Sequence, residues 1–408
     1  MKVKYIALLP VLVLALVIAI PLAFGNDPVA VHHSAATATA GHRVSVEQAG
    51  HRSSAATRSA PSTPPDPFAV KTVAHPWTAG QTQTGIQIYW SLSRTDTTAD
   101  LWGKAQRAVD YAVSLNANSV CLTFPFATPG PYASSVGAES ATPTPTDIGI
   151  FLQEAAKAKL RVTLRPLLDE STLGPPKGWR GNIDPDSLTD WFASYRTFLT
   201  PYATAAQRYG AATFVVGTEF NSLEGDPRWP GLISDMGRIF HGQIGYDANY
   251  DDYLADPTIA VPAQVLGVDA YFHVDVSDDA SPQAITEGWE QALDQKSASS
   301  LQSLVLSEVG IIDQDGAFDQ PGDFYATDPF NPGMQPTWYT GVCQVVKDRH
   351  IAGIYFWDIS LDDNPAQPAP STESDLDFAG RPDSEAARAR RARPAAARRS
   401  RSGLVRWS

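Results

Sequence analysis

The chain has 408 residues, enough for one large α/β domain with additional segments at its ends. It carries 31 Lys and Arg against 44 Asp and Glu, and the formal net charge of -13 excludes the broad basic surface of a nucleic-acid-binding protein. Its two cysteines, Cys121 and Cys343, lie in a strand-like and a helix-like apolar run, so we expect buried thiols rather than a disulfide. No Cys and His cluster has the spacing of metal ligands, and no cofactor is expected.

The first 25 residues have the pattern of a targeting segment. Lys2 and Lys4 precede an apolar run over residues 6–25, about the length that crosses a bilayer. We expect either a cleaved signal peptide or a retained membrane anchor, and both place the protein outside the cell, secreted or on the outer face of the membrane. Residues 26–80 are rich in Ala, Ser, Thr, His and Pro without periodicity, which predicts a disordered linker.

Between residues 81 and 378 short apolar runs alternate with amphipathic patterns. The runs typical of strands cover 85–90, 119–126, 161–168, 213–220, 243–248, 265–272, 304–309 and 351–357. Helical patterns lie at 101–115, 147–159, 188–209 and 338–348, and the poorest helix connects the fifth and sixth strands. This alternation predicts a single (β/α)8 TIM-barrel domain. The alternative is a doubly wound open sheet, against which no Gly-x-Gly-x-x-Gly follows the first strand.

The last segment, residues 379–408, differs in composition from the rest. It carries nine Arg against Asp383 and Glu385, with many Ala and no apolar face. Such a composition predicts a disordered tail. A polyanion-binding arm and a frame-shifted end of the sequence both fit it.

Two of the predicted strands end in a glutamate. The run Ala212-Thr-Phe-Val-Val-Gly-Thr-Glu-Phe220 delivers Glu219, and Ser303-Leu-Val-Leu-Ser-Glu-Val-Gly310 delivers Glu308. Catalytic groups of such barrels lie at the C-terminal ends of the strands, and strands four and seven face each other across the mouth. Glycoside cleavage requires one protonated acid and one ionised carboxylate on opposite sides of the anomeric carbon. A carboxyl separation of ~5.5 Å would indicate retention, with Glu308 as nucleophile and Glu219 as acid/base.

The other strand ends supply aromatic and polar side chains. They include Trp90 on the first strand, Arg165 on the third, Asn249 on the fifth, Tyr271 on the sixth and Trp357 on the eighth. Aromatic rings stack on the apolar faces of sugars, and polar groups bind the hydroxyls. The rim therefore suits a carbohydrate substrate.

Several ordered motifs resemble glycoside hydrolase family 113, within the clan A barrel hydrolases. They are Asn118-Ser-Val-Cys-Leu-Thr123, Thr144-Pro-Thr-Asp147, Trp179-Arg-Gly-Asn-Ile183, Trp191-Phe-Ala-Ser-Tyr195, Val216-Gly-Thr-Glu219, Tyr246-Asp-Ala-Asn249, Gly267-Val-Asp-Ala-Tyr-Phe272 and Ser307-Glu-Val-Gly310. Members of that family are chiefly retaining β-1,4-mannanases. The resemblance implies that Glu219 is the acid/base and Glu308 the nucleophile. It further implies that Tyr271 hydrogen-bonds the nucleophile, that Trp357 forms the floor of the sugar subsite, and that Asn249 and Trp179 lie near the substrate.

The third strand departs from this resemblance. It reads Leu164-Arg-Pro-Leu-Leu-Asp169 where Lys-Pro-His-x-Asp is expected. Arg165 keeps the positive charge in a planar fork, whereas Leu167 cannot make the polar contact of a histidine. The sequence thus predicts an exported retaining glycoside hydrolase acting on mannan-like β-1,4-linked polysaccharide. The alternative is a non-catalytic carbohydrate-binding barrel at the cell surface, although both glutamates are present.

Overall fold

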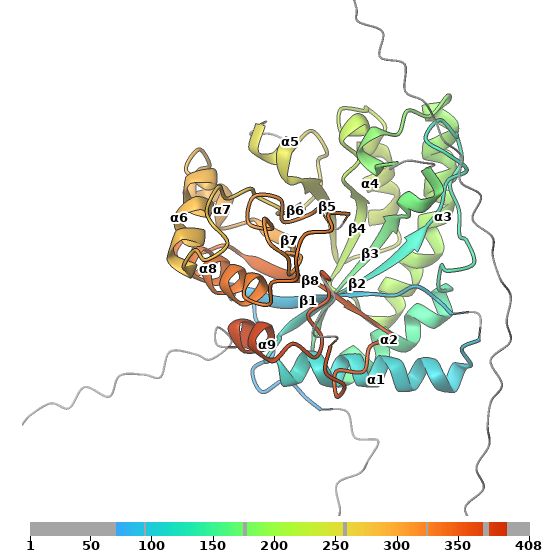
Figure 1. Cartoon of the computed structure of the whole chain (residues 1–408). Coiled ribbons are helices and arrows are strands. Elements are labelled where there is room, and N and C mark those ends of the chain that lie inside the picture. Colours follow the sequence, from blue (N-terminus) through green and yellow to red (C-terminus); the bar gives the residue numbers. More distant parts are fainter. Residues whose placement is uncertain are drawn as a thin grey trace, which may run out of the picture. The chain divides into compact units, whose positions relative to one another are not determined.

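The computed structural model describes residues 71–93, 95–173, 178–255, 259–323, 325–369 and 375–389. Within these residues, parallel strands β1 to β8 pair in sequence order and β8 pairs with β1, which closes a barrel (Figure 1). The strands are β1 Gln83–Tyr89, β2 Ser119–Phe126, β3 Arg161–Leu168, β4 Thr213–Thr218, β5 Gln243–Asn249, β6 Val265–Asp269, β7 Val305–Val309 and β8 Gly353–Ser360. The predicted (β/α)8 barrel is confirmed, and the open sheet is excluded. The predicted targeting segment, linker residues 26–70 and residues 390–408 lie outside the described part of the chain.

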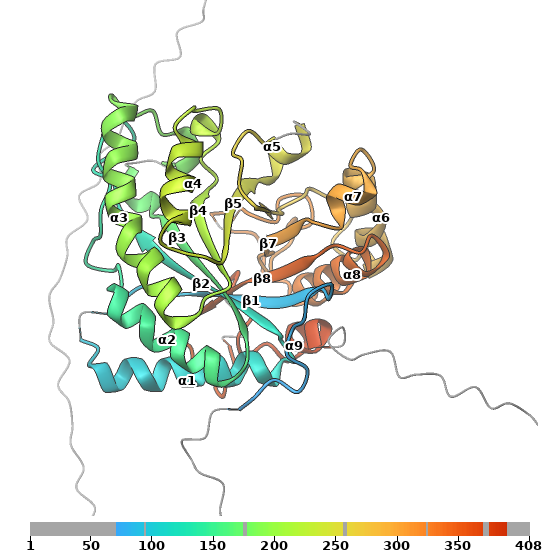
Figure 2. The ribbon, with the colours of Figure 1, turned by 180° about the vertical axis from the view of Figure 1, so that it is seen from behind.

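Helices surround the strands, with α2, α3 and α4 on one side and α6, α7 and α8 on the other (Figure 2). The α-helices are α1 Thr98–Ser114, α2 Pro145–Lys157, α3 Leu188–Tyr209, α4 Trp229–Gly237, α5 Tyr250–Ala255, α6 Pro282–Leu293, α7 Ala298–Leu301, α8 Met334–Asp348 and α9 Pro382–Ala389. Short 3₁₀ turns follow β3 and β4, namely η1 Glu170–Leu173, η2 Arg180–Asn182 and η3 Asn221–Leu223. The six-residue α5 matches the weak helix expected between the fifth and sixth strands.

Local sequence signals fix where the longer helices begin. Thr97 caps α1 and Thr144 caps α2, each in a reciprocal capping box with the acid three residues later. The Thr144-Pro-Thr-Asp147 motif therefore has a structural role, since it starts α2. Helix α3 ends at Gly210, which adopts the left-handed conformation (φ 79°) that glycine tolerates best.

An aromatic cluster between α3 and α4 holds the C-terminal end of β4. The ring of Phe220 lies 5.4 Å from that of Trp191 and 6.3 Å from that of Trp229, and all three side chains are buried. Because Phe220 directly follows Glu219, this packing restrains the backbone that carries the predicted acid.

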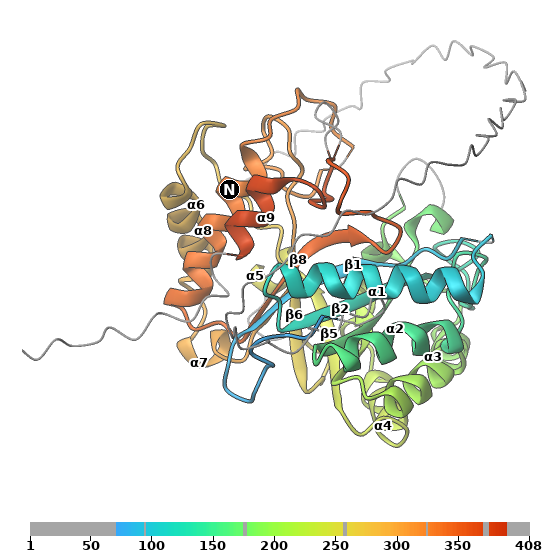
Figure 3. The ribbon, with the colours of Figure 1, turned by 90° about the horizontal axis from the view of Figure 1, so that it is seen from below.

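The expectation of a wholly disordered C-terminal tail was wrong for residues 382–389. They form helix α9, which packs beside α8 (Figure 3). Arg388 is 3% exposed, and its guanidinium carbon lies 3.2 Å from the ring centroid of Phe378. Tyr111 donates a hydrogen bond to Glu385 (2.6 Å). Composition did not predict this helix because a cation–π contact replaces the usual apolar face.

Two further expectations concern burial and the membrane. Cys121 and Cys343 are both buried, as the sequence predicted. Across the described ranges, no helix combines the length and the apolar character needed to cross a bilayer.

Candidate active site

A cavity of about 1230 Å³ opens at the C-terminal ends of the strands. It is lined by most of the side chains expected at the site, namely Glu219, Glu308, Asn249, Tyr271, Trp179 and Trp357. Tyr89, Asp169, Glu170, Arg180, Tyr250, His273 and Asp358 also line it. The strand ends therefore bring the two glutamates and an aromatic rim into one pocket, as barrel topology requires.

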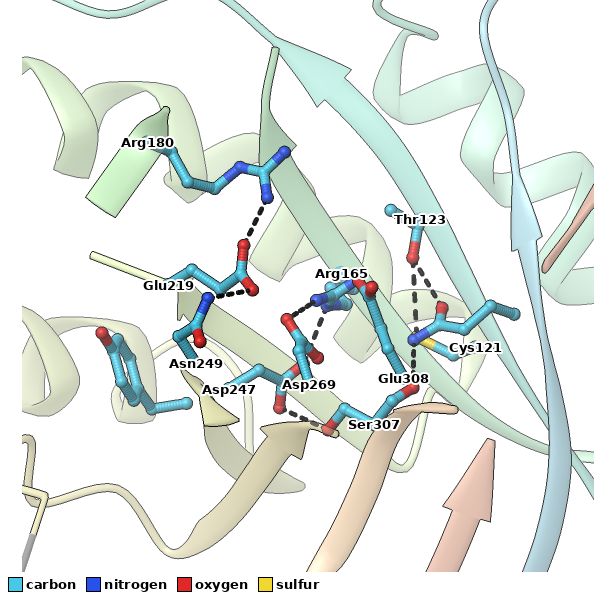
Figure 4. A network of polar contacts seen from close by, with 12 residues as sticks. Cys121, Thr123, Arg165, Arg180, Glu219, Asp247, Asn249, Asp269, Ser307 and Glu308 are labelled. Atoms are coloured by element: carbon cyan, nitrogen blue, oxygen red, sulfur yellow. Dashed lines mark hydrogen bonds and ion pairs between the residues drawn. The ribbon is translucent and has the colours of Figure 1, made fainter. Parts of the chain in front are cut away.

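Glu219 follows the last residue of β4 and is held by hydrogen bonds to both carboxylate oxygens. Asn249 donates to its Oε1 (2.9 Å), and Arg180 donates to its Oε2 (2.5 Å), as Figure 4 shows. Its backbone N–H donates to the carbonyl of Asp247 (2.8 Å). Its φ of 51° is rare for a residue other than glycine and is typical of functional positions. The side chain is thus fixed at the pocket wall and is only 6% exposed.

Burial raises the pKa of Glu219 above its ordinary value. Repulsion from Glu308 raises this pKa further, whereas Arg180 and, more weakly, Arg165 lower it. A carboxyl group with a raised pKa can hold a proton at the pH where an ordinary glutamate is ionised. Glu219 therefore has the environment of a proton donor.

Glu308 lies on β7 and receives one donor on each oxygen. Tyr271 donates to its Oε2 (2.7 Å), the contact that the family resemblance implied. Arg165 donates to its Oε1 (2.5 Å). One cationic and one neutral donor suit an ionised carboxylate. The two glutamates thus have different surroundings within one pocket.

Arg165 was expected to contact the substrate, and the structure contradicts this. It is fully buried beneath the pocket and does not line it. Besides Glu308, it contacts Asp269 (2.6 Å) and Asp247 (2.8 Å), so three carboxylates surround one guanidinium. Burial raises the pKa of Asp269 well above its ordinary value, although Arg165 opposes this rise. The fork of Arg165 points into the barrel because it pairs with acids on β5, β6 and β7, none of which is hydrogen-bonded to β3.

A buried polar network continues below Arg165 inside the barrel. Ser307 donates to Asp247 (2.9 Å), and Gln87 donates to the carbonyl of Ser307 (2.8 Å). Thr123 in turn donates to Gln87 (2.7 Å). These hydrogen bonds join β1, β2, β5 and β7 beneath the glutamates, and a satisfied buried network of this kind restrains the strands that carry them.

Trp90 was also expected to contact the substrate, and the structure places it elsewhere. It is 1% exposed in the hydrophobic core and is not among the residues that line the pocket, whereas its neighbour Tyr89 is. Successive side chains along an extended chain point to opposite sides, so only one of the two can face the pocket. Trp357, in the second half of β8, does line it and contacts the ring of Tyr89 (6.1 Å between centroids).

Arg180 and Glu170 are functional candidates that the sequence reasoning did not single out. Arg180 contacts Glu219 directly, its Nη2 lies 3.2 Å from Glu170, and its Nε donates to the carbonyl of Leu168 (3.1 Å). A signal was present, since Arg180 directly follows Trp179 in one of the matched motifs. In the described part of the chain, no group of three or more His, Cys, Asp or Glu is arranged to hold a metal ion.

Comparison with known proteins assigns the barrel to a family. The family model of Glycoside Hydrolase Family 113 matches residues 98–381. The chain belongs to this family. As a family 113 member it is a glycoside hydrolase, which agrees with the prediction from its motifs and from its two glutamates.

Solved structures of similar fold include other members of the family. A structure described as a GH113 beta-1,4-mannanase shares 17% identity with a TM-score of 0.65, over 76% of this chain and 99% of that one. The GH113 beta-mannanase AaManA from Alicyclobacillus acidocaldarius, in complex with ManMIm, shares 22% identity with a TM-score of 0.59, over 76% of this chain and 97% of that one. No match was found among curated proteins. At these identities the structures show a common fold.

Proposed function

We propose that this family 113 glycoside hydrolase cleaves a mannan-like β-1,4-linked polysaccharide by a two-step displacement that retains the anomeric configuration. The observation that carries the proposal is the contrast between the two glutamates in one pocket. Burial raises the pKa of Glu219, whereas Glu308 receives a cationic and a hydroxyl donor. Environments that differ in this way assign the acid and the nucleophile.

In the first step, a carboxylate oxygen of Glu308 attacks the anomeric carbon and the glycosidic C–O bond breaks. Glu219 donates its proton to the departing oxygen, which leaves as a hydroxyl group of the released sugar. Tyr271 and Arg165 hold Glu308 in place for the attack. The step leaves a glycosyl ester on Glu308 and an ionised Glu219.

In the second step, Glu219 acts as a base. It takes a proton from a water molecule, whose oxygen attacks the anomeric carbon from the face that the leaving group vacated. The ester bond to Glu308 breaks, which restores the carboxylate, and Glu219 regains its proton. Two inversions at one carbon give net retention.

The proposed substrate class rests on the pocket and on the relatives. The aromatic side chains of Tyr89, Trp179, Tyr250, Tyr271 and Trp357 line a cavity whose volume of about 1230 Å³ accommodates several sugar units. Aromatic rings bind the apolar faces of pyranose sugars. The similar solved structures are described as β-mannanases, which favours mannan over other β-1,4-linked polymers.

We also propose that the enzyme acts outside the cell, either secreted or anchored to the outer face of the membrane. The support is the lysine-flanked apolar run over residues 6–25 and the polar, Pro-containing stretch that follows it. Detection of the intact barrel in culture medium or in a membrane fraction would separate these two forms, and a purely cytosolic protein would contradict the proposal.

The test compares Glu308→Gln and Glu219→Gln with the unaltered enzyme on mannan, glucomannan, chitosan and xylan. We expect release of reducing sugar from mannan, and a loss of at least about 10³-fold for Glu308→Gln, because the attacking carboxylate is gone. Glu219→Gln should lose activity on the polysaccharide but keep much of it on aryl glycosides, whose leaving groups need no proton. The exposed Glu287→Gln is the matched control and should change nothing.

Two results would contradict the proposal. Full activity of the Glu308→Gln variant would exclude Glu308 as the nucleophile. Binding of the polysaccharides without release of reducing sugar from any of them would favour the non-catalytic carbohydrate-binding barrel instead.

A further inference from the structure

Arg180 lies on η2, in the connection from β3 to α3, and its guanidinium is held by three contacts. These are the hydrogen bond to the Leu168 carbonyl, the pair with Glu170 and the pair with Glu219. Its side chain is only 15% exposed. Since a planar guanidinium with several fixed partners has little freedom, its charge stays beside Glu219 throughout the reaction.

We propose that Arg180 is a positioning residue that enables Glu219 to act as the base in the second step, by stabilising its ionised form once Glu308 has become an ester. This inference rests on the proposed two-step reaction. It gives a role to Arg180, to which the family resemblance assigned none. The role follows from a conflict between the two steps, because the first requires protonated Glu219 and the second requires it ionised.

The charges around Glu219 differ between the two steps. In the free enzyme, burial and the charge of Glu308 raise the pKa of Glu219, and Arg180 is the largest opposing influence. When Glu308 forms an ester it loses its negative charge, so its repulsion of Glu219 ends while the charge of Arg180 remains. The pKa of Glu219 therefore falls in the glycosyl-enzyme, and the proton leaves the group that must now act as a base.

Other titratable or charged groups also act on Glu219, and their placement leaves Arg180 as its direct cationic partner. They are Arg165 on β3, Glu170 on η1, Tyr246 and Asp247 on β5, Tyr250 on α5, Asp269 at the end of β6, Tyr271 beyond it and Glu308 on β7. Arg165 contacts Asp247, Asp269 and Glu308 rather than Glu219. Replacing Arg180 should thus alter the pKa of Glu219 more than replacing Arg165.

Replacing Glu170 should shift the pKa of Glu219 in the direction opposite to that caused by replacing Arg180. It shares Arg180 with Glu219, and its negative charge repels that of Glu219. Loss of the Arg180 charge should raise the pKa of Glu219, whereas loss of the Glu170 charge should lower it. A purely structural effect on the pocket would not produce shifts in opposite directions.

The experiment uses Arg180→Met, Arg180→Lys and Glu170→Gln in the full chain, with Arg196→Met as the control. Arg196 is an exposed arginine of α3 that pairs with Asp235, and neither residue lines the pocket. The probe is an aryl β-mannoside or β-mannobioside with an activated phenol leaving group, so that the first step needs little proton donation. The measurements are the pH profile of kcat/KM on mannan, the pre-steady-state release of phenol, and the effect of azide.

For Arg180→Met we expect the alkaline limb of kcat/KM to move up by about one pH unit, because that limb reports the essential acid of the free enzyme. Phenol should appear in a burst of one equivalent per enzyme, followed by turnover about 10–100-fold slower than in the unaltered enzyme, because removal of the base contribution slows hydrolysis of the ester. Azide, which attacks without base assistance, should restore the rate. Arg180→Lys should give values between those of Arg180→Met and the unaltered enzyme. Glu170→Gln should move the alkaline limb to lower pH, and Arg196→Met should match the unaltered enzyme.

The inference is overturned if folded Arg180→Met shows neither a burst nor a moved alkaline limb, or if azide fails to accelerate it. If Arg180→Met does not fold, the opposite shifts of Arg180→Lys and Glu170→Gln decide, and shifts in the same direction overturn the inference. Failure of the proposed function is recognised separately, because it would appear in the unaltered enzyme as inversion or in Glu308→Gln as retained activity.

Discussion

The two glutamates are each paired with an arginine at 2.5 Å, yet the two arginines belong to different kinds of structure. Arg165 projects from a barrel strand, is fully buried and is shared by Glu308, Asp247 and Asp269. Arg180 lies on a connecting segment at the pocket, is 15% exposed and is shared by Glu219 and Glu170. The Arg165 pair therefore holds Glu308 inside a rigid buried network. The Arg180 pair leaves the pKa of Glu219 sensitive to changes in the nearby charges.

The different surroundings of Glu308 and Glu219 match what the reaction requires of each carboxyl group. A nucleophile needs one ionisation state before attack and a fixed position, which strands and buried hydrogen bonds provide. An acid that later acts as a base needs both states, which a balance between burial and one nearby cation provides. Changes in the Arg165 network should thus affect stability and activity together, whereas changes around Glu219 should mainly affect pH dependence.

The largest expected effect is that of Arg165→Met. It leaves three buried carboxyl groups without their cation, and removing one partner of a buried ion pair typically costs about 3–5 kcal/mol. We expect a loss of this size in the free energy of unfolding, measured by urea titration, together with loss of activity.

Asp269→Asn serves as the comparison within the same network. Burial already raises the pKa of Asp269 well above its ordinary value, so removing its charge should cost much less than removing that of Arg165. Equal stability losses for the two variants, or a stable Arg165→Met, would contradict the network as described.

A smaller effect is expected from Tyr271→Phe, which removes the hydroxyl donor to Glu308 without changing the size of the ring. A hydrogen bond to a charged group contributes about 1.5–3 kcal/mol, so kcat should fall by about 10–100-fold. Asn249→Ala removes the corresponding donor to Glu219. It should lower the maximum of kcat/KM and also change its dependence on pH. Steady-state kinetics across pH distinguishes the two, and identical profiles would remove the contrast between the glutamates.

The smallest effects are expected from changes at two tryptophans, Trp90 in the core and Trp357 in the pocket. Trp90→Phe should lower stability by about 1–3 kcal/mol through imperfect packing and leave KM unchanged, since Trp90 lies in the core. Trp357→Ala should raise KM, because it removes an aromatic surface from the pocket. Thermal unfolding and substrate titration measure the two effects, and a raised KM for Trp90→Phe would restore it as a substrate contact.

The fold and the two glutamates were predictable because both depend on local patterns in the chain. Apolar runs ending in an acid at 219 and 308 identify strands and their C-terminal ends without any knowledge of tertiary contacts. The side to which Trp90 or Tyr89 points depends on where the strand ends, which a sequence pattern does not define to one residue.

The roles of Arg165 and Arg180 could be assigned only from the folded structure. Arg165 and Asp269 are 104 positions apart, and Arg180 and Glu219 are 39 apart, so no spacing rule connects them. Arg388 shows the same limit, because its burial depends on the ring of Phe378 rather than on the apolar pattern of its own helix. Pairings between distant charged residues depend on tertiary structure, and these account for most of what the sequence reasoning missed.

If Glu219 and Glu308 act in a two-step displacement, the first product keeps the anomeric configuration of the substrate. Proton NMR of a manno-oligosaccharide digest, recorded within minutes of mixing and before mutarotation, distinguishes the β from the α anomer. We expect the β anomer to appear first and the α anomer to follow only as the sugar equilibrates. Initial appearance of the α anomer would show a single displacement by water and would contradict the assignment of Glu308 as nucleophile.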